Sequence, residues 1–209
     1  MLSGSEQGSG SGRELDAFLE REAHEHRVAF ESLMRDLAEP FAKVLSIWEA
    51  SIRRGGKLLV FGNGGSAGNS EHIAAEMVVR YQVNRAPIPA LALTVDHSTL
   101  TAAANDLGFE SVFARQIEAL GRPGDVAVAL STSGCSPNIL AALRRARAAD
   151  LRTTGLSGAE GGEMRALCDA IVLVPSDITA RIQEMHLLVS HMLCKALETR
   201  LGLTERSLR

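Results

Sequence analysis

The sequence predicts an α/β protein with a five-stranded parallel sheet that is covered by helices on both faces. Five short apolar segments occur along the chain, and segments with helical spacing separate them. Strands that are buried on both faces have this continuous apolar pattern, whereas half-exposed strands alternate. Aromatic residues make up only 4% of the chain, so Ala, Leu, Val and Ile must fill the core.

Length, net charge and cysteine content exclude several other kinds of protein. A chain of 209 residues fits one domain with a helical extension. A formal net charge of −3 argues against nucleic-acid binding through bulk electrostatics. No apolar run approaches the roughly 20 residues that span a bilayer, and no basic start precedes an apolar stretch, so we expect neither a membrane segment nor a secretory signal. Cys135, Cys168 and Cys194 are widely spaced and odd in number, which favours a reducing, cytoplasmic location.

The N-terminal part is expected to be helical after a short tail. Residues 1–12 are rich in Gly and Ser and are expected to form a disordered tail. Residues 13–38 have helical apolar spacing, Pro40 interrupts it, and a second helix is expected at 41–53. Two amphipathic helices before the first strand indicate packing against another surface, such as a second copy. We therefore divide the chain into a tail (1–12), N-terminal helices (13–55), a sheet domain (56–201) and a C-terminal tail (202–209).

The rest of the chain alternates predicted strands and helices. The strands are expected at residues 57–61, 89–94, 125–130, 152–156 and 170–174. The helices are expected at residues 71–81, 98–105, 111–120, 139–149 and 179–201. Parallel strands need such crossover connections, which are usually helical.

The strongest local feature is the sequence STSGCSPN at residues 131–138, which joins an apolar strand to a helix. Backbone N–H groups and the hydroxyls of Ser131, Thr132 and Ser133 converge at a helix N-terminus, where phosphate binds well. Ser136 adds another hydroxyl. No lysine follows in the Walker pattern, so the loop does not predict nucleotide hydrolysis. An ordinary capped strand–helix loop explains the same residues.

A second glycine-rich loop, GNGGS at residues 62–66, follows the first strand. It loosely resembles a dinucleotide-binding fingerprint. However, no acidic residue lies about 20 positions further on at a strand end, as that fingerprint requires. A tight turn is the alternative interpretation.

Pairs of polar residues share helix faces further along the chain. His72 and Glu76 are four residues apart on a predicted helix, and a His and a carboxylate at this spacing can both bind a zinc-like ion. On the last predicted helix, Gln183 and His186 share a face, and His191 follows them. Surface pairs and core polar residues are the alternatives on local evidence.

Four segments together resemble the phosphoheptose isomerases (sedoheptulose-7-phosphate isomerases) of the sugar isomerase (SIS) domain class. These are GNGGSAGNSEHIAAE, RYQVNRAPIPALAL, AANDLGFESVFARQIEALGRPGDVAVALSTSGCSPN and TARIQEMHLLVSHML. The resemblance covers residues 47–197. It implies a flavodoxin-like five-stranded parallel sheet, a homotetramer and one zinc ion per subunit. The implied reaction interconverts sedoheptulose 7-phosphate and D-glycero-D-manno-heptose 7-phosphate, the first step of ADP-heptose biosynthesis for lipopolysaccharide.

The resemblance also implies roles for individual residues. The implied metal ligands are His72, Glu76, Gln183 and His191. The implied substrate contacts are Asn63, Gly64, Gly65, Glu76, Asn105, Asp106, Ser131, Thr132, Ser133, Ser136 and Gln183. Glu76 is expected to take the proton from carbon and His191 to protonate the oxygen, while zinc stabilises the enediolate as a Lewis acid.

Two other functions are compatible with the same fold. SIS domains also occur in non-catalytic phosphosugar sensors and in tetrameric scaffolds that bind the DnaA initiator. Those scaffolds resemble this chain at ARIQEMHL but lack residues that match Glu76 and His191, so both residues favour the enzyme. An isomerase that acts on a different phosphosugar is the second alternative.

The spacing of the implied ligands leads to one further expectation. Gln183 and His191 are eight residues apart, so their Cα atoms lie about 12 Å apart along a regular helix. A zinc ion about 2 Å from each ligand is not easily reached by both side chains of one straight helix. We therefore expect Glu76 and His191 of one site to come from different chains, with the site at a subunit interface.

Overall fold

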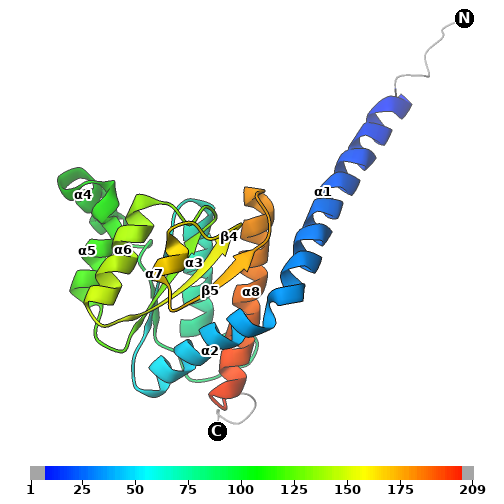
Figure 1. Cartoon of the computed structure of the whole chain (residues 1–209). Coiled ribbons are helices and arrows are strands. Elements are labelled where there is room, and N and C mark those ends of the chain that lie inside the picture. Colours follow the sequence, from blue (N-terminus) through cyan, green and yellow to red (C-terminus); the bar gives the residue numbers. More distant parts are fainter. Residues whose placement is uncertain (1–7, 204–209) are drawn as a thin grey trace, which may run out of the picture.

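Apolar strands form the centre of the molecule. In the computed structural model, which describes residues 8–203, they build one five-stranded parallel sheet in the order β2-β1-β3-β4-β5 (Figure 1). The strands are β1 (Leu58–Gly62), β2 (Ala90–Ala92), β3 (Val126–Ser131), β4 (Arg152–Gly158) and β5 (Ala170–Val174). Every residue of β1 and β3 is buried, as expected for strands with helices on both sides. The predicted flavodoxin-like sheet is confirmed.

Helices cover both faces of the sheet (Figure 1). One apolar cluster packs under α1 (Gly8–Asp36), α2 (Ala38–Arg53), α3 (Gly65–Val78) and α8 (Thr179–Arg200). The other lies under α4 (His97–Leu107), α5 (Val112–Leu120), α6 (Pro137–Ala148) and α7 (Met164–Leu167), with a 3₁₀ turn at Phe109–Ser111. Trp48 of α2 is fully buried, and its Nε1 donates to Thr154 Oγ1 at 3.0 Å, which joins α2 to the sheet.

The N-terminal boundaries differ from the prediction. Helix α1 begins at Gly8, so residues 8–12 are helical and not a tail, whereas residues 1–7 and 204–209 lie outside the described part. Helix α2 begins at Ala38 and contains Pro40, because a proline in the first turn has no intrahelical N–H bond to lose. The division into N-terminal helices and sheet domain stays a prediction. Within residues 8–203, no helix has both the length and the apolar content for a bilayer crossing.

Helix α3 begins six residues earlier than predicted and ends three earlier. Its N-cap is Gly64, with φ of +55°, a backbone conformation that glycine adopts at low cost. The connection from β1 to α3 is therefore reduced to Asn63 and Gly64. This short turn places the start of α3 directly above the carboxyl end of β1.

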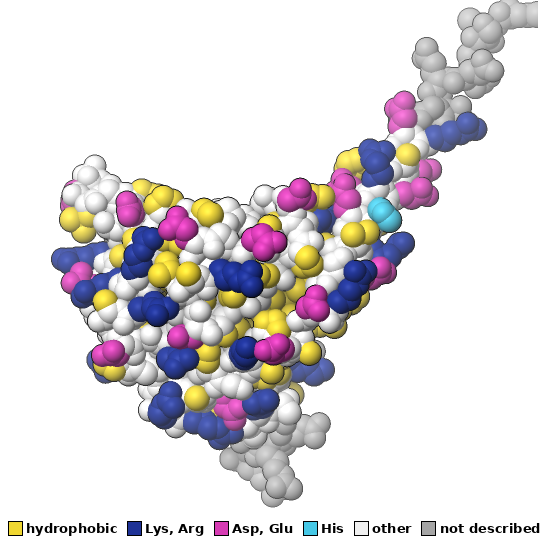
Figure 2. All heavy atoms as spheres, viewed as in Figure 1, with side chains coloured by type: hydrophobic (Ala, Val, Ile, Leu, Met, Phe, Trp, Pro, Cys, Tyr) yellow, Lys and Arg dark blue, Asp and Glu magenta, His cyan; other side chains and the backbone are white. Residues whose placement is uncertain are grey.

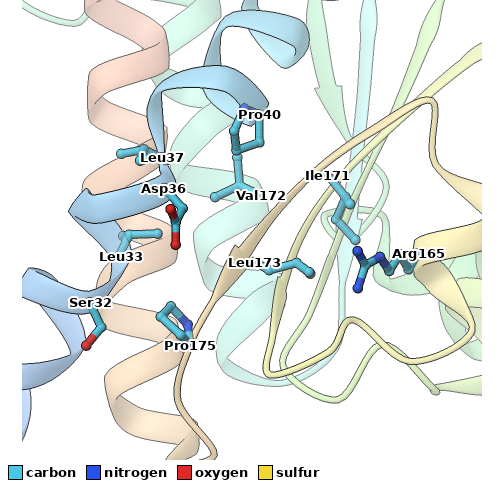
Figure 3. A pocket seen from close by; sticks show the side chains of 10 residues that line it. All are labelled: Ser32, Leu33, Asp36, Leu37, Pro40, Arg165, Ile171, Val172, Leu173 and Pro175. Carbon is cyan, nitrogen blue, oxygen red and sulfur yellow. The ribbon is translucent and has the colours of Figure 1, made fainter.

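A groove lies at the edge of the sheet, where α1 bends into α2 beside β5 (Figure 3). Leu33 and Leu37 form one side, and Leu173 and Pro175 lie opposite. This groove lies beside the edge strand β5, whereas the two glycine- and serine-rich loops follow β1 and β3 in the middle of the sheet.

Candidate active site

The topology brings the two glycine- and serine-rich loops together. The strand order reverses between β1 and β3, so the loops after these strands leave the same edge of the sheet side by side. Ligands of open α/β sheets bind at such a switch point. Here the amides of Asn63 and Asn138 exchange two hydrogen bonds, at 2.9 and 2.8 Å. Asn138 is buried, and sequence analysis gave it no role, because only the folded chain shows its partner.

The hydroxyl loop after β3 is ordered by its own side chains. Ser131 Oγ accepts the N–H of Gly134 at 3.1 Å, and Ser133 Oγ accepts that of Cys135 at 3.2 Å. Gly134 has φ of +65° and packs against the backbone of Gly161 so closely that a Cβ would not fit. Each serine hydroxyl still has its own proton to donate. The loop thus offers donors in a fixed arrangement at the start of α6, which fits an anion.

A second group of site residues lies on α3 and α8. His72 Nε2 is 2.9 Å from His191 Nε2 and 3.2 Å from Glu76 Oε1, and His191 Nε2 is 3.8 Å from the same oxygen. Among the described residues, the buried Glu76 Oε2 has no hydrogen-bond partner. These three side chains, from two helices of one chain, form the metal-type cluster.

The cluster fits a zinc-like ion. Tetrahedral ligands at about 2.0–2.1 Å from zinc are about 3.3 Å from each other, close to the three distances observed. Two imidazoles and one carboxylate are donors that zinc accepts, and three protein ligands leave a coordination position open. The carboxylate oxygen without a partner also agrees with a cation at this place.

The expectation that Glu76 and His191 come from different chains is wrong for this pair. Helices α3 and α8 pack side by side on the same face of the sheet, so one chain supplies both side chains. Spacing along one helix does not limit the cluster, because the cluster joins two helices, and residues on neighbouring helices approach closely without any helix distortion.

Gln183 lies elsewhere along the same helix pair. Its side-chain amide atoms are 2.6 Å from where a Cβ on Gly65 would stand, so only glycine fits there. Asn69 Nδ2 also donates to the Gln183 carbonyl at 3.2 Å. Gly65 precedes His72 by two helical turns, about 10 Å. The amide of Gln183 is therefore beside the first loop, and its roles in metal and substrate binding stay predictions.

Tyr81 and Cys194 lie beside the cluster, although the sequence gave neither of them a role in the site, whereas His186 is buried elsewhere on α8. The Tyr81 ring packs against His191, with ring centroids 5.4 Å apart. Burial, with help from the Glu76 and Glu198 carboxylates, raises the pKa of the Cys194 thiol and keeps it protonated. His186 is fully buried, and burial lowers its pKa to about 4.

Within residues 8–203, no side-chain hydrogen bond joins Asn105 or Asp106 to the hydroxyl loop or to the metal-type cluster. They lie inside the last turn of α4, which Gly108 ends with φ of +87°, so the helix expected at residues 98–105 extends two residues further. Within residues 8–203, Asn105 Nδ2 donates to Asp106 Oδ1 at 2.7 Å, and both residues are exposed. Their substrate role stays a prediction.

Comparisons with known proteins identify the family of the chain. Residues 23–158 match the SIS domain family. A phosphoheptose isomerase of Paramagnetospirillum magneticum is 51% identical over 87% of this chain and 94% of its own length. The structure of a phosphoheptose isomerase from Neisseria gonorrhoeae has a TM-score of 0.84 at 38% identity, covering 88% of this chain and 99% of that one. One from Francisella tularensis has a TM-score of 0.82 at 33% identity, covering 90% and 98%.

Proposed function

Because the chain belongs to the phosphoheptose isomerase family of SIS-domain proteins, we propose that it interconverts sedoheptulose 7-phosphate and D-glycero-D-manno-heptose 7-phosphate. The observation that carries the proposal is the metal-type cluster formed by α3, which follows the first loop of the switch point, and α8. It combines a carboxylate and two imidazoles. Helix α3 begins just after Asn63, which is hydrogen-bonded to Asn138 at the start of α6, the helix that follows the hydroxyl loop. An aldose–ketose isomerase needs these two elements, a proton-transfer centre and an anchor for phosphate.

The hydroxyl loop, residues 131–136, is the proposed phosphate anchor. Its serine hydroxyls and the start of α6 favour a doubly charged group. Asn63 is hydrogen-bonded to Asn138 of α6, and this pair holds the glycine-rich loop after β1 beside the hydroxyl loop. A phosphate bound there fixes the far end of the sugar, so C1 and C2 remain in place during proton transfer.

Glu76 and His191 are the proposed proton-transfer pair. The Glu76 carboxylate takes the proton from the carbon next to the carbonyl, and the His191 imidazole delivers a proton to the carbonyl oxygen. Reversal of both transfers at the other carbon completes the isomerisation and returns both residues to their starting states. His191 Nε2 and Glu76 Oε1 are 3.8 Å apart, so both groups can face one substrate. An imidazole nitrogen bound to zinc has no proton to give, so His191 would act as the acid only while its Nε2 is free of the ion.

His72, Glu76 and His191 are the proposed zinc ligands, with one ion per subunit. The Gln183 amide lies beside Gly65, so Gln183 would have to change its side-chain conformation to become a fourth ligand. When bound, zinc supplies a Lewis acid that stabilises negative charge on the sugar oxygens. The two imidazoles of the cluster approach each other nitrogen to nitrogen at 2.9 Å, a contact that suits ligands of one cation.

The proposed assembly is a homotetramer with active sites close to subunit interfaces. Helix α1 extends away from the sheet and carries apolar side chains on its surface (Figure 2). These include Leu15, Phe18, Leu19, Val28 and Met34, which are 43–57% exposed in the single chain. Apolar surface of this kind on a helix is typical of a protein–protein contact. A neighbouring chain would add contacts around the site without supplying the Glu76–His191 pair.

A non-catalytic scaffold for the DnaA initiator remains the alternative of another class, and an isomerase of another phosphosugar remains a second. The cluster favours an enzyme, since a binding scaffold does not need a proton-transfer pair. We place the reaction in the cytoplasm, and we propose that it is the first step of ADP-heptose biosynthesis.

The experiment that tests this function incubates the purified protein with zinc and sedoheptulose 7-phosphate and follows aldose formation. Aldose should appear with the wild-type protein and not with Glu76→Gln. Ribose 5-phosphate and fructose 6-phosphate, tested in parallel, separate the heptose from other phosphosugars. Turnover of one of these with none of the heptose would support the second alternative. No turnover of any sugar would contradict an enzymatic function.

A further inference from the structure

A buried ion pair joins the ends of the two helices that carry the cluster. Arg85 Nε donates to Glu198 Oε1 at 2.8 Å, and the two side chains are 0% and 2% exposed. Arg85 lies in the segment after α3, and Glu198 is near the end of α8. Burying two charges costs much of what their attraction returns, so such a pair is a poor source of stability. Its contacts indicate a geometric role instead.

The Arg85 guanidinium holds the C-terminal end of α3. Nη1 donates to the Met77 carbonyl at 2.7 Å, and Nη2 donates to the Glu76 carbonyl at 2.8 Å. The last carbonyls of a helix have no partner within the helix, and a cation there interacts favourably with the helix dipole. One of the two carbonyls belongs to Glu76 itself. Arg85 therefore fixes the backbone of the residue whose carboxylate faces His191.

The Glu198 carboxylate connects the same segment to His191. The oxygen that accepts from Arg85 also accepts the Tyr81 N–H at 3.1 Å. The Tyr81 ring then lies against His191, with planes inclined by 31°. His72 contacts the His191 ring as well, at 5.0 Å between centroids and 61° between planes. Packing against Tyr81 and His72 restricts how the His191 ring can turn.

We propose that Arg85, Glu198 and Tyr81 are positioning residues for the metal-type cluster. The ion pair fixes α3 against α8 in the arrangement that brings Glu76 to His191, and Tyr81 holds the His191 ring. Only the expected effect on turnover rests on the proposed function. Because the hydroxyl loop is built from other contacts, loss of the ion pair lowers metal affinity and kcat and leaves KM nearly unchanged.

The test replaces both charges together, as Arg85→Met/Glu198→Leu. Removing one partner would leave a buried charge unpaired, whereas replacing a whole buried pair by apolar side chains is often tolerated. Arg200→Ala is the matched control, since Arg200 pairs with Glu49 of α2 at 3.1 Å and ties α8 to a different helix. Tyr81→Ala and Tyr81→Phe test the ring contact separately.

Two measurements do not depend on the substrate. Cobalt(II) titration followed by visible absorption reports metal affinity. The NMR resonance of the His191 ring, assigned with His191→Gln, reports its position in metal-free protein. The double variant should unfold cooperatively, bind cobalt about 10- to 100-fold more weakly and show a shifted His191 resonance. Tyr81→Ala should shift the resonance, Tyr81→Phe should retain it, and Arg200→Ala should match the wild type in both measurements.

A folded double variant with wild-type cobalt affinity and an unshifted His191 resonance overturns the proposal. If the double variant does not fold, an unshifted resonance in Tyr81→Ala does so. If the wild type does not bind cobalt, the resonance alone decides. A wild-type protein that binds cobalt but isomerises no sugar contradicts the proposed function, and both measurements still decide the positioning role.

Discussion

The two parts of the candidate site differ in how their residues are spaced along the chain. The hydroxyl loop consists of six consecutive residues, 131–136, whereas His72 and His191 of the metal-type cluster are 119 positions apart. The loop takes its shape from hydrogen bonds between neighbours, such as Ser131 Oγ with the Gly134 N–H. The cluster exists only because α3 packs against α8. Local chemistry therefore determines the loop, while tertiary packing determines the cluster, and the two should respond separately to mutation.

The largest expected effect comes from the cluster. Glu76→Gln removes the proposed base and a proposed ligand with almost no change in shape. We expect kcat to fall about 10²- to 10⁴-fold, as for loss of a general base. Phosphosugar binding, measured by calorimetry, should remain, because the hydroxyl loop is intact. A kcat within a factor of ten of wild type would remove Glu76 from the chemistry.

His72→Ala tests metal binding by the same cluster. Loss of a ligand should lower both the zinc retained after dialysis and the turnover, and added zinc should restore turnover only partly. Metal analysis by mass spectrometry gives the zinc content. The control is His24→Ala, an exposed histidine of α1. Full zinc content and full activity in His72→Ala would show that His72 is not a ligand.

Ser133→Ala addresses the loop. Loss of one hydrogen bond to a charged phosphate should weaken substrate binding by roughly 1.5–3 kcal/mol, while cobalt affinity stays at the wild-type level. Ser46→Ala, at an exposed serine of α2, should change neither. A Ser131→Ala/Ser133→Ala protein that binds substrate and free phosphate like the wild type would contradict the anchor. A fall in cobalt affinity in Ser133→Ala would instead show that the two parts are coupled.

The smallest effect concerns stability and not catalysis. His186 of α8 is fully buried, and among the described residues neither ring nitrogen has a hydrogen-bond partner. Burial lowers its pKa from 6.5 to about 4, and the nearby Ser157 backbone only partly opposes the shift. The unfolded chain therefore binds more protons between these values, so stability falls as the pH drops through this range. From pH 7 to 5.5 this residue should account for a loss of about 1 kcal/mol.

Urea unfolding of wild type and His186→Leu at pH 7 and 5.5 measures this loss. The wild type should lose more stability than the variant over the same step, because leucine does not titrate. Equal losses in the two proteins would show that His186 is not protonated on unfolding in this range.

The sequence by itself determined the sheet, its approximate strands and the hydroxyl loop, because these depend on local pattern. The continuous apolar run at residues 126–130 forms the fully buried strand β3, as its pattern predicts, whereas Ile171 and Leu173 of the edge strand β5 are only partly buried. Residues 131–136 have their hydroxyls together in any fold that puts them between a strand and a helix. The boundaries of α3 were less well predicted, since Gly64 sets its start through a backbone conformation that the pattern does not reveal.

The tertiary structure alone decided which chain completes the cluster and what surrounds it. The sequence offered His72, Glu76 and His191 as candidates but led to the wrong arrangement, because spacing along one helix contains no information about a neighbouring helix. The Asn63–Asn138 amide pair and the Arg85–Glu198 ion pair join residues 75 and 113 positions apart. Such contacts form only after the sheet has brought distant helices together, since hydrogen bonds and ion pairs act over a few ångströms in space regardless of separation along the chain.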